Sequence, residues 1–228
     1  MEPPEPMSPP GRWVCLDVGE TLIDETRIWS IWADVLGIPR LTFMAALGAV
    51  IAASGEHRDV FGEFGLAEAE WRAQIPEVER RYGGFGESDL YPDARPAIAA
   101  LTEAGYRVAV LANQPASRSA ELRALGISPE VLSMSDEMGV AKPDPAFFQR
   151  ALELLGQPRP EDVAYVGDRV DNDVLPAMAA GMRAVWLRRG PWGVIQRLPQ
   201  GTVPALVVSN LDELVERIGQ AYGSAPFA

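Results

Sequence analysis

The spacing of hydrophobic residues changes along the chain. Residues 13–16, WVCL, form a continuous apolar run that ends at Asp17, which is typical of a short buried strand. Between about residues 26 and 88, apolar side chains recur at helical spacing, and prolines and glycines separate the segments. This region therefore predicts several short helices. From about residue 92 onward, helical segments alternate with short apolar runs.

The second half of the chain predicts a regular alternation of helices and strands. Helices are expected over 92–105, 115–126, 145–156, 172–181 and 211–222, and strands over 106–113, 130–135, 162–168, 183–189 and 205–210. Repeated units of this kind with continuous apolar strands are typical of a parallel sheet that is covered on both faces. The expected fold class is therefore α/β with a doubly wound parallel sheet, in which ligands bind beyond the carboxyl ends of the strands.

The change in pattern also predicts the domain organisation. We expect residues 12–25 and 90–222 to form a core domain, and residues 26–89 to form a small helical domain inserted into it. Residues 1–11 are rich in proline and are expected to form a disordered or extended tail. They lack the basic and apolar regions of a signal peptide, and no apolar run has the length of a transmembrane helix. We therefore expect a cytoplasmic protein without a membrane partner.

Composition narrows the classes of partner and site. The net charge of −12 disfavours nucleic acid as a partner, because phosphate binding needs a basic surface. A single cysteine, Cys15, excludes an internal disulfide and a cysteine zinc cluster. The chain also has a single lysine, Lys142. We expect a small-molecule partner and a monomer or homodimer.

Polar side chains stand where the predicted strands end. Three strands end in an acid or an amide, two more acids follow the last of these, and the single lysine precedes a helix. These residues are Asp17, Asn113, Asp168, Asp171, Asp173 and Lys142. Because the carboxyl ends of parallel strands meet at one edge of a sheet, we expect these groups to lie close together.

The segments that carry these residues resemble the four motifs of the haloacid dehalogenase (HAD) superfamily of hydrolases. In order, they are LDVGETL (16–22), VLAN (110–113), AKPDPAFF (141–148) and VAYVGDRVDNDVLPAMAAGM (163–182). The resemblance covers most of residues 12–220. It implies a HAD-like Rossmannoid core with a helical cap domain inserted between the first and second motifs.

The resemblance also implies an enzyme that needs Mg²⁺. The metal would be bound by Asp17, the backbone carbonyl of Gly19 and Asp168, with waters completing its shell. Asp173 would hold the waters of the metal, and Asp171 is a weaker candidate for that role. Carboxylate and carbonyl oxygens are the ligands that Mg²⁺ prefers, and the ion offsets the repulsion between a carboxylate and a phosphate.

The same resemblance implies a covalent mechanism. Asp17 would attack phosphorus to form an aspartyl-phosphate, which divides one difficult displacement into two easier ones. Lys142 would neutralise Asp17 and bind the phosphoryl oxygens, Asn113 would donate a hydrogen bond to them, and Gly19 would also belong to the phosphate-binding residues. The expected activity is that of a Mg²⁺-dependent hydrolase acting on a small phosphorylated metabolite.

Two positions depart from the pattern of the family. Its phosphatases usually carry a second aspartate where this chain has Gly19, and that acid protonates the leaving oxygen and then helps to activate water. Acid–base assistance is typically worth about 10² to 10⁴-fold in rate. The neighbouring Glu20 could compensate from another direction, and an aspartate at position 19 would restore the donor. Ala112 replaces the serine or threonine whose hydroxyl usually contacts the phosphate.

Other functions stay open beside this one. The first is a catalytically weak or inactive HAD-fold protein that binds metal and phosphate. A 2-haloacid dehalogenase is less favoured, because these enzymes usually carry a tyrosine at the position of Gly19 and need no metal, whereas Asp168 and Asp173 indicate one. Phosphonatases need a lysine in the cap, and Lys142 lies in the third core motif.

Residues of the helical region offer candidates for substrate recognition. Arg27, Trp29 and Trp32 follow the first motif and either face the site or pack inside the helical region itself. His57 lies in a polar stretch and is expected at the surface. Residues 188–193, RRGPWG, follow a strand. They are expected to form a solvated loop, and the less favoured alternative is that Arg188 or Arg189 reaches an anionic substrate.

Overall fold

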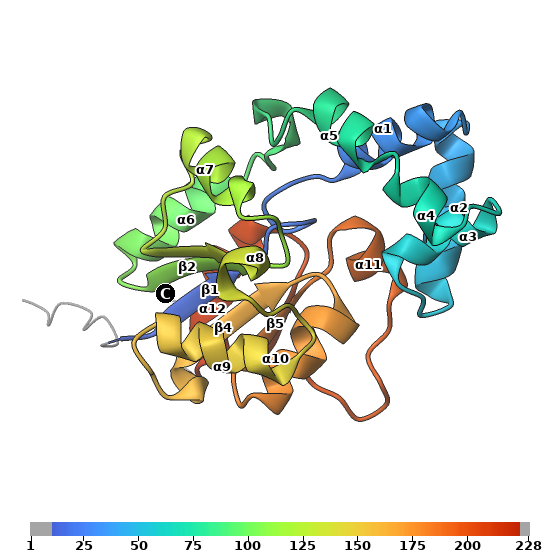
Figure 1. The fold of residues 1–228 in the computed structure, drawn as a ribbon. Helices are drawn as coiled ribbons and strands as arrows, with labels where there is room; N and C mark the ends of the chain where they lie inside the picture. Colours follow the sequence, from blue (N-terminus) through green and yellow to red (C-terminus); the bar gives the residue numbers. More distant parts are fainter. Residues whose placement is uncertain (1–10, 224–228) are drawn as a thin grey trace, which may run out of the picture.

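A six-stranded parallel sheet lies at the centre of the computed structural model, which describes residues 11–223 (Figure 1). The strands are β1 (Trp13–Leu16), β2 (Arg107–Ala112), β3 (Val131–Met134), β4 (Val163–Gly167), β5 (Arg183–Leu187) and β6 (Leu206–Val208). Their order across the sheet is β3-β2-β1-β4-β5-β6. The predicted α/β fold class is confirmed. Most of the predicted Pro-rich tail, residues 1–10, lies outside the described residues.

The strand order explains why one edge of the sheet gathers the polar residues. β1 lies between β2 and β4, and Leu16 is opposite Val110 on one side and Val166 on the other. The chain winds outward from β1 to β3, returns to β4 and winds outward again to β6. In such a sheet the connections diverge at the turning point and leave a crevice beyond the strand ends. Here that crevice lies beyond β1 and β4.

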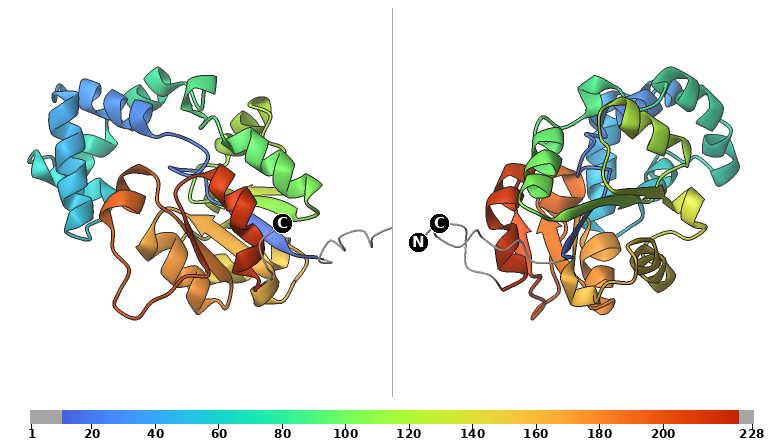
Figure 2. Two further views of the ribbon diagram at one scale, coloured as in Figure 1. Left: turned by 180° about the vertical axis from the view of Figure 1, so that it is seen from behind. Right: turned by 90° about the vertical axis from the view of Figure 1, so that its left-hand side faces the viewer.

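Helices cover both faces of the sheet (Figures 1 and 2). Val14 and Leu16 of β1 belong to one apolar cluster, whereas Trp13 and Cys15 belong to another, as the alternation of side chains along a strand requires. The first cluster includes side chains of α6 (Ala94–Glu103), α7 (Ser117–Ala124) and α12 (Leu211–Ala221), and the second includes side chains of α9 (Pro145–Leu154) and α10 (Leu175–Ala179). The sheet is therefore buried on both sides, as its apolar strands predicted.

The predicted helical region consists of five helices, here called the helical insert. They are α1 (Thr26–Leu36), α2 (Arg40–Ala52), α3 (Val60–Glu63), α4 (Glu68–Arg72) and α5 (Ile75–Tyr82). The insert has an apolar cluster of its own, in which Trp32, Phe61 and Trp71 pack with ring centroids 4.7 to 6.2 Å apart. Within residues 11–223 no single helix is long and apolar enough to cross a membrane. Only α1 and α2 together meet that test, and the chain bends by 115° between them.

The segment after β5 corrects one expectation. Residues 188–193 were expected to form a solvated loop, but α11 (Gly190–Ile195) begins within them. Trp192 is 3% exposed and belongs to the apolar cluster of the insert. Arg189 is ion-paired with Asp93, and its side chain is 11% exposed. The polar residues before Trp192 suggested a solvated loop, whereas Trp192 packs against the insert.

The chain also forms two short elements that periodicity did not predict. Residues Ser135–Met138 form helix α8 directly after β3. Residues Val170–Val174 form one π-helical turn before α10, so the predicted helix over 172–181 is divided in two. Such turns are rare inside helices and are often found at functional sites. This one carries Asp173.

Candidate active site

Three carboxylates converge at the carboxyl ends of β1 and β4. Asp17 follows β1 directly, and its backbone N–H donates to the carbonyl of Val166, 2.9 Å away in β4. Asp168 follows β4, and Asp173 lies on the π-helical turn beyond it. One carboxylate oxygen from each of the three lies within 4.8 Å of the others, and all three residues are buried. The predicted convergence of these acids is thus present in the structure.

Lys142 lies among these acids. Its Nζ donates to Oδ1 of Asp17 at 2.7 Å and to Oδ1 of Asp173 at 2.5 Å, and its side chain is 1% exposed. Asn113 fixes the loop that carries the lysine: its Nδ2 donates to the Lys142 carbonyl at 2.8 Å, and the Lys142 N–H donates to its Oδ1 at 2.7 Å. The predicted lysine therefore contacts Asp17, and the predicted amide lines the same cavity and fixes the backbone of the lysine.

The charges of this cluster are not balanced by Lys142 alone. Burial raises the pKa of Asp17 to about 6, although the Lys142 ammonium opposes that shift. Burial, followed by the charges of Asp173 and Asp17, raises the pKa of Asp168 well above its usual value. Burial alone would lower the pKa of Lys142, but Asp17 and Asp173 raise it well above its usual value. Three carboxylates thus face one ammonium.

The donor set fits a divalent cation. Oδ2 of Asp168 is buried and has no hydrogen-bond partner, although buried carboxylate oxygens are normally satisfied. Clustered carboxylate oxygens suit Mg²⁺, and a cation would compensate the excess negative charge. Asp171 lies outside this cluster, because its carboxylate accepts from Arg169 at 2.7 Å and from Gln196 at 2.9 Å.

Gly19 is in close contact with a side chain that the sequence did not indicate. A Cβ at this position would lie 2.6 Å from Oε1 of Glu25. The φ angle of Gly19 is not positive, so the glycine provides space and not an unusual backbone conformation. Glu25 precedes α1 and was not a candidate, since one more acid in a polar turn carries no distinguishing signal. Burial, followed by the charge of Glu20, raises its pKa to about 8.

Glu20, the less favoured alternative source of the missing acid, has other partners. Its Oε2 accepts from the hydroxyl of Tyr91 at 2.6 Å, and its Oε1 accepts from the backbone N–H of Glu25 at 3.0 Å. The residue is 5% exposed, and its side chain packs against Gly190. Glu20 therefore holds the chain at Glu25 in place.

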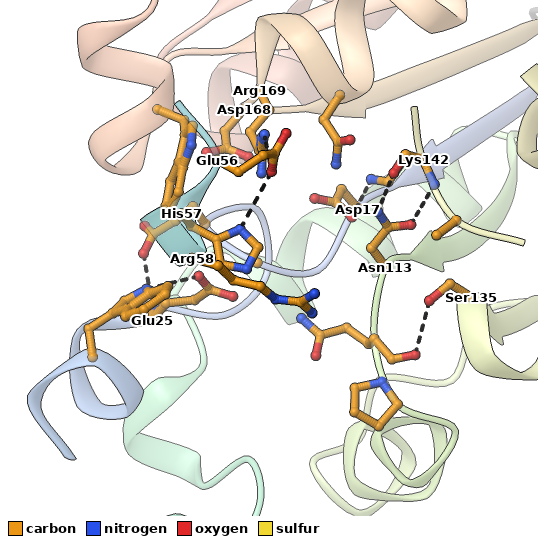
Figure 3. A pocket seen from close by; sticks show the side chains of 18 of the residues that line it. Asp17, Glu25, Glu56, His57, Arg58, Asn113, Ser135, Lys142, Asp168 and Arg169 are labelled. Atoms are coloured by element: carbon orange, nitrogen blue, oxygen red, sulfur yellow. Dashed lines mark hydrogen bonds and ion pairs between the residues drawn. The ribbon is translucent and has the colours of Figure 1, made fainter. Parts of the chain in front are cut away.

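A cavity of about 730 Å³ lies between the sheet edge and the insert. Asp17, Asn113 and Lys142 lie on one side of it, and Glu25 and His57 lie on the other (Figure 3). The indole of Trp29 also lines the cavity, and its Nε1 donates to Oε2 of Glu25 at 3.3 Å. The cavity thus joins core and insert residues in one site.

His57 was expected at the surface, and the structure corrects this. Its ring packs between Trp29 and Trp192, with centroid distances of 5.8 and 6.4 Å, and its side chain is 33% exposed. Burial, followed by the charges of Arg169 and Arg58, lowers its pKa to about 4. A polar sequence around His57 could not reveal two aromatic neighbours that are distant along the chain.

The other candidates of the insert were predicted either to face the site or to pack inside the helical region, and both arrangements occur. Trp29 both lines the cavity and packs in the cluster of the insert. Trp32 packs in that cluster, with its ring 4.7 Å from that of Phe61. Arg27 pairs with Asp89 at 2.5 Å and donates to two backbone carbonyls of the insert region.

An ion pair links the insert to the core at the rim of the cavity. Glu56 of the insert lies 3.5 Å from Arg169, which follows β4. The Arg169 guanidinium also lies 5.4 Å from the ring of Trp192. Both residues of the pair line the cavity, as Asp168 does (Figure 3).

The sequence matches the family model of haloacid dehalogenase-like hydrolases over residues 12–181, more than half of the chain. A glyceraldehyde 3-phosphate phosphatase of Methanopyrus kandleri is 36% identical over 130 residues, which are 55% of each protein. A phosphoserine phosphatase of Thermus thermophilus is 33% identical over 176 residues, which are 70% of this chain and 68% of that protein. The chain thus spans about half of the first relative and two thirds of the second.

Solved structures show the same fold. An HAD phosphatase from Thermococcus onnurineus matches with a TM-score of 0.59 and 23% identity, over 92% of this chain and 98% of that one. The L-2-haloacid dehalogenase RSc1362 matches with a TM-score of 0.67 and 17% identity, over 91% of this chain and 98% of that one. A phosphatase and a dehalogenase are both similar, so the fold alone does not select the reaction.

Proposed function

The chain belongs to the haloacid dehalogenase-like hydrolases, and from this premise we propose that it is a Mg²⁺-dependent phosphatase of a small phosphorylated metabolite. One observation carries the proposal: Lys142 is held between Asp17 and Asp173 while Oδ2 of Asp168 is buried without a partner. In such a site the Lys142 ammonium can bind the phosphate. The carboxylate oxygens supply part of the ligand set of a metal ion. The phosphatase names of the relatives support the substrate class.

We assign the metal to the carboxylates of Asp17 and Asp168 and to the backbone carbonyl of Gly19. Asp173 would hold the waters of the metal. When bound, Mg²⁺ would polarise the phosphoryl group and offset its repulsion from the carboxylates. The assignment is supported by the close approach of the three acids and by their shared burial.

The residues of the chain itself account for the covalent step. Asp17 supplies the nucleophilic oxygen and forms the aspartyl-phosphate. Lys142 lies 2.7 Å from that carboxylate and is positioned to bind the phosphoryl oxygens as they approach. Asn113 has a second amide hydrogen that is free to bond the same oxygens, since its Nδ2 carries two. Ala112 offers no hydroxyl there.

The helical insert, with the adjoining residues up to 89, would act as the cap domain of this site. Trp29, His57 and Arg58 line the cavity opposite Asp17, so a bound metabolite would contact them. A cap that covers the site excludes water from the reacting groups. This arrangement would let the insert select the non-phosphate part of the substrate.

A binding protein without turnover is the second candidate, because the usual acid at position 19 is absent. A 2-haloacid dehalogenase is less well supported. It would have no use for Asp168 and Asp173, which here stand with Asp17 in a cluster suited to a cation. Release of inorganic phosphate separates the phosphatase from the other two candidates. Binding of Mg²⁺ separates both the phosphatase and the binding protein from a dehalogenase.

The test combines activity with metal binding. We expect phosphate release from a panel of phosphate esters that requires Mg²⁺ and is lost in Asp17→Asn. Titration calorimetry should detect Mg²⁺ binding to the wild type and none to Asp168→Ala. The matched control is Asp171→Ala, which removes the same charge from an acid outside the cluster and should bind as the wild type does. Equal binding by Asp168→Ala would contradict the metal assignment.

A further inference from the structure

Glu25 places a carboxyl group in the cavity next to Gly19, which is two residues after Asp17, and two hydrogen bonds fix its position. Its Oε2 accepts from the indole of Trp29 at 3.3 Å, and its backbone N–H donates to Glu20 at 3.0 Å. Its Oε1 lies 2.6 Å from the point that a Cβ of Gly19 would occupy. The carboxyl group therefore fills the space that an aspartate at position 19 would need.

The reaction needs such a group. The oxygen that leaves an alkyl phosphate becomes a strongly basic alkoxide unless it receives a proton as the P–O bond breaks. Lys142 is engaged by two carboxylates, and Asp17 is the proposed nucleophile. Glu20 is engaged by Tyr91, and Glu56 lies at the rim beside Arg169 with its side chain 64% exposed.

We propose that Glu25 is a catalytic residue that supplies the acid and base missing at Gly19. The inference rests on the proposed function. In the first step Asp17 forms a bond to phosphorus, the bond to the leaving oxygen breaks, and the Glu25 carboxyl gives that oxygen its proton. In the second step Glu25 takes a proton from water, the water oxygen bonds to phosphorus, and the bond to Asp17 breaks. The products are an alcohol and inorganic phosphate, and both carboxyl groups return to their initial state.

Gly19 has a defined role in this arrangement. Because the Cβ of any other residue would meet the Glu25 carboxyl, glycine is what allows the acid to approach from the insert side. An aspartate at position 19 would displace Glu25, so the two acids replace each other. Gly19→Asp alone should therefore change the rate much less than it would in a site that had no other acid.

The experiment compares two leaving groups. For β-glycerophosphate, we expect Glu25→Gln to lower kcat/KM by about 100-fold, the low end of acid–base assistance. For p-nitrophenyl phosphate, whose phenolate leaves without a proton, kcat/KM should change little. The second step still needs the base, so this variant should accumulate phosphorylated protein on the nitrophenyl ester, seen by intact mass after acid quench. Glu63→Gln makes the same change on an exposed position of the insert and is the control.

A double variant tests the exchange directly. In Glu25→Ala with Gly19→Asp, the new carboxylate has room, and the ratio of kcat/KM between the two esters should return toward that of the wild type. Glu25→Ala alone should behave as Glu25→Gln does. Circular dichroism confirms that each variant is folded before the ratios are compared.

The outcomes separate the two proposals. If the wild type with Mg²⁺ releases phosphate from neither ester nor from acetyl phosphate, both the phosphatase and the role of Glu25 are wrong. If it is active but Glu25→Gln keeps the wild-type ratio, only the role of Glu25 is wrong. Equal losses on both esters without phosphorylated protein would assign Glu25 to structure and overturn its catalytic role.

Discussion

The Lys142 ammonium is the residue on which the electrostatics of the site depend most directly. It is 1% exposed at its side chain and bonds two carboxylates, and the ring of Tyr165 lies 5.2 Å from its Nζ. Buried ion pairs of this kind are costly to break one partner at a time, because the remaining charge cannot be solvated. Its loss should therefore be visible in both stability and activity.

We predict that Lys142→Met abolishes phosphate release and lowers the free energy of unfolding by about 3–5 kcal/mol without Mg²⁺. Methionine keeps the length of the side chain but leaves Asp17 and Asp173 without their cation. Added Mg²⁺ should then stabilise the variant more than the wild type, because it becomes the main compensating charge. Urea unfolding with and without Mg²⁺ measures this, and wild-type activity in the variant would refute the role of Lys142.

The sequence predicted the site residues that lie in local motifs at the ends of strands. It did not predict the site residues that only tertiary packing brings to the cavity. Asp17 and Asp168 directly follow strands and Lys142 belongs to a contiguous motif before a helix, so local patterns were enough to group them. His57 reaches the site only because the insert folds back over the sheet edge, and Glu25 is held next to Gly19 by its contacts with Glu20 and Trp29. Their positions depend on how separate helices pack, which no local pattern records.

At the scale of elements, α11 carries a residue of the core segment into the apolar cluster of the insert. The helix has six residues and begins with Gly190 and Pro191, a start that resembles a turn. Its Trp192 is buried in the cluster of the insert, and Ile195 packs against that cluster. A single tryptophan on a core element therefore helps to hold the insert against the sheet.

We predict that Trp192→Ala destabilises the protein by about 3–5 kcal/mol, as large-to-small changes of buried aromatic residues do. The loss comes from packing, since the Trp192 Nε1 has no hydrogen-bond partner. Val194→Ala on the same helix, at a residue that is 54% exposed, should cost less than about 0.5 kcal/mol. Urea unfolding of both variants measures the difference, and similar costs would show that α11 does not anchor the insert.

At the scale of the whole molecule, the α/β fold of the core was predictable from the sequence. The position of the helical insert relative to the sheet was not. Continuous apolar strands that alternate with helices left a parallel α/β sheet as the expected fold. The same periodicity carried no information on where the helical insert rests. In the structure it meets the core through the pair of Glu56 and Arg169, and through His57 between Trp29 and Trp192.

This junction should be sensitive to acid. His57 has a pKa lowered to about 4 from its ordinary 6.5, so protonation favours the unfolded chain. Its contribution to stability is present above pH 6.5 and is lost as the pH falls toward 4. We predict that the wild type loses about 1 kcal/mol more than His57→Gln between pH 7 and pH 5, allowing for partial exposure. Identical pH dependence in urea unfolding of the two proteins would contradict this.

The close approach of Glu25 to Gly19 also constrains how such a chain can evolve. A side chain at position 19 and the carboxylate at position 25 compete for one volume, so the two positions cannot be substituted independently. A descendant that gains an aspartate at position 19 displaces Glu25 but still has an acid, whereas a descendant that loses Glu25 first passes through a chain with neither. The order of the two changes is therefore constrained, and the change at position 19 should come first.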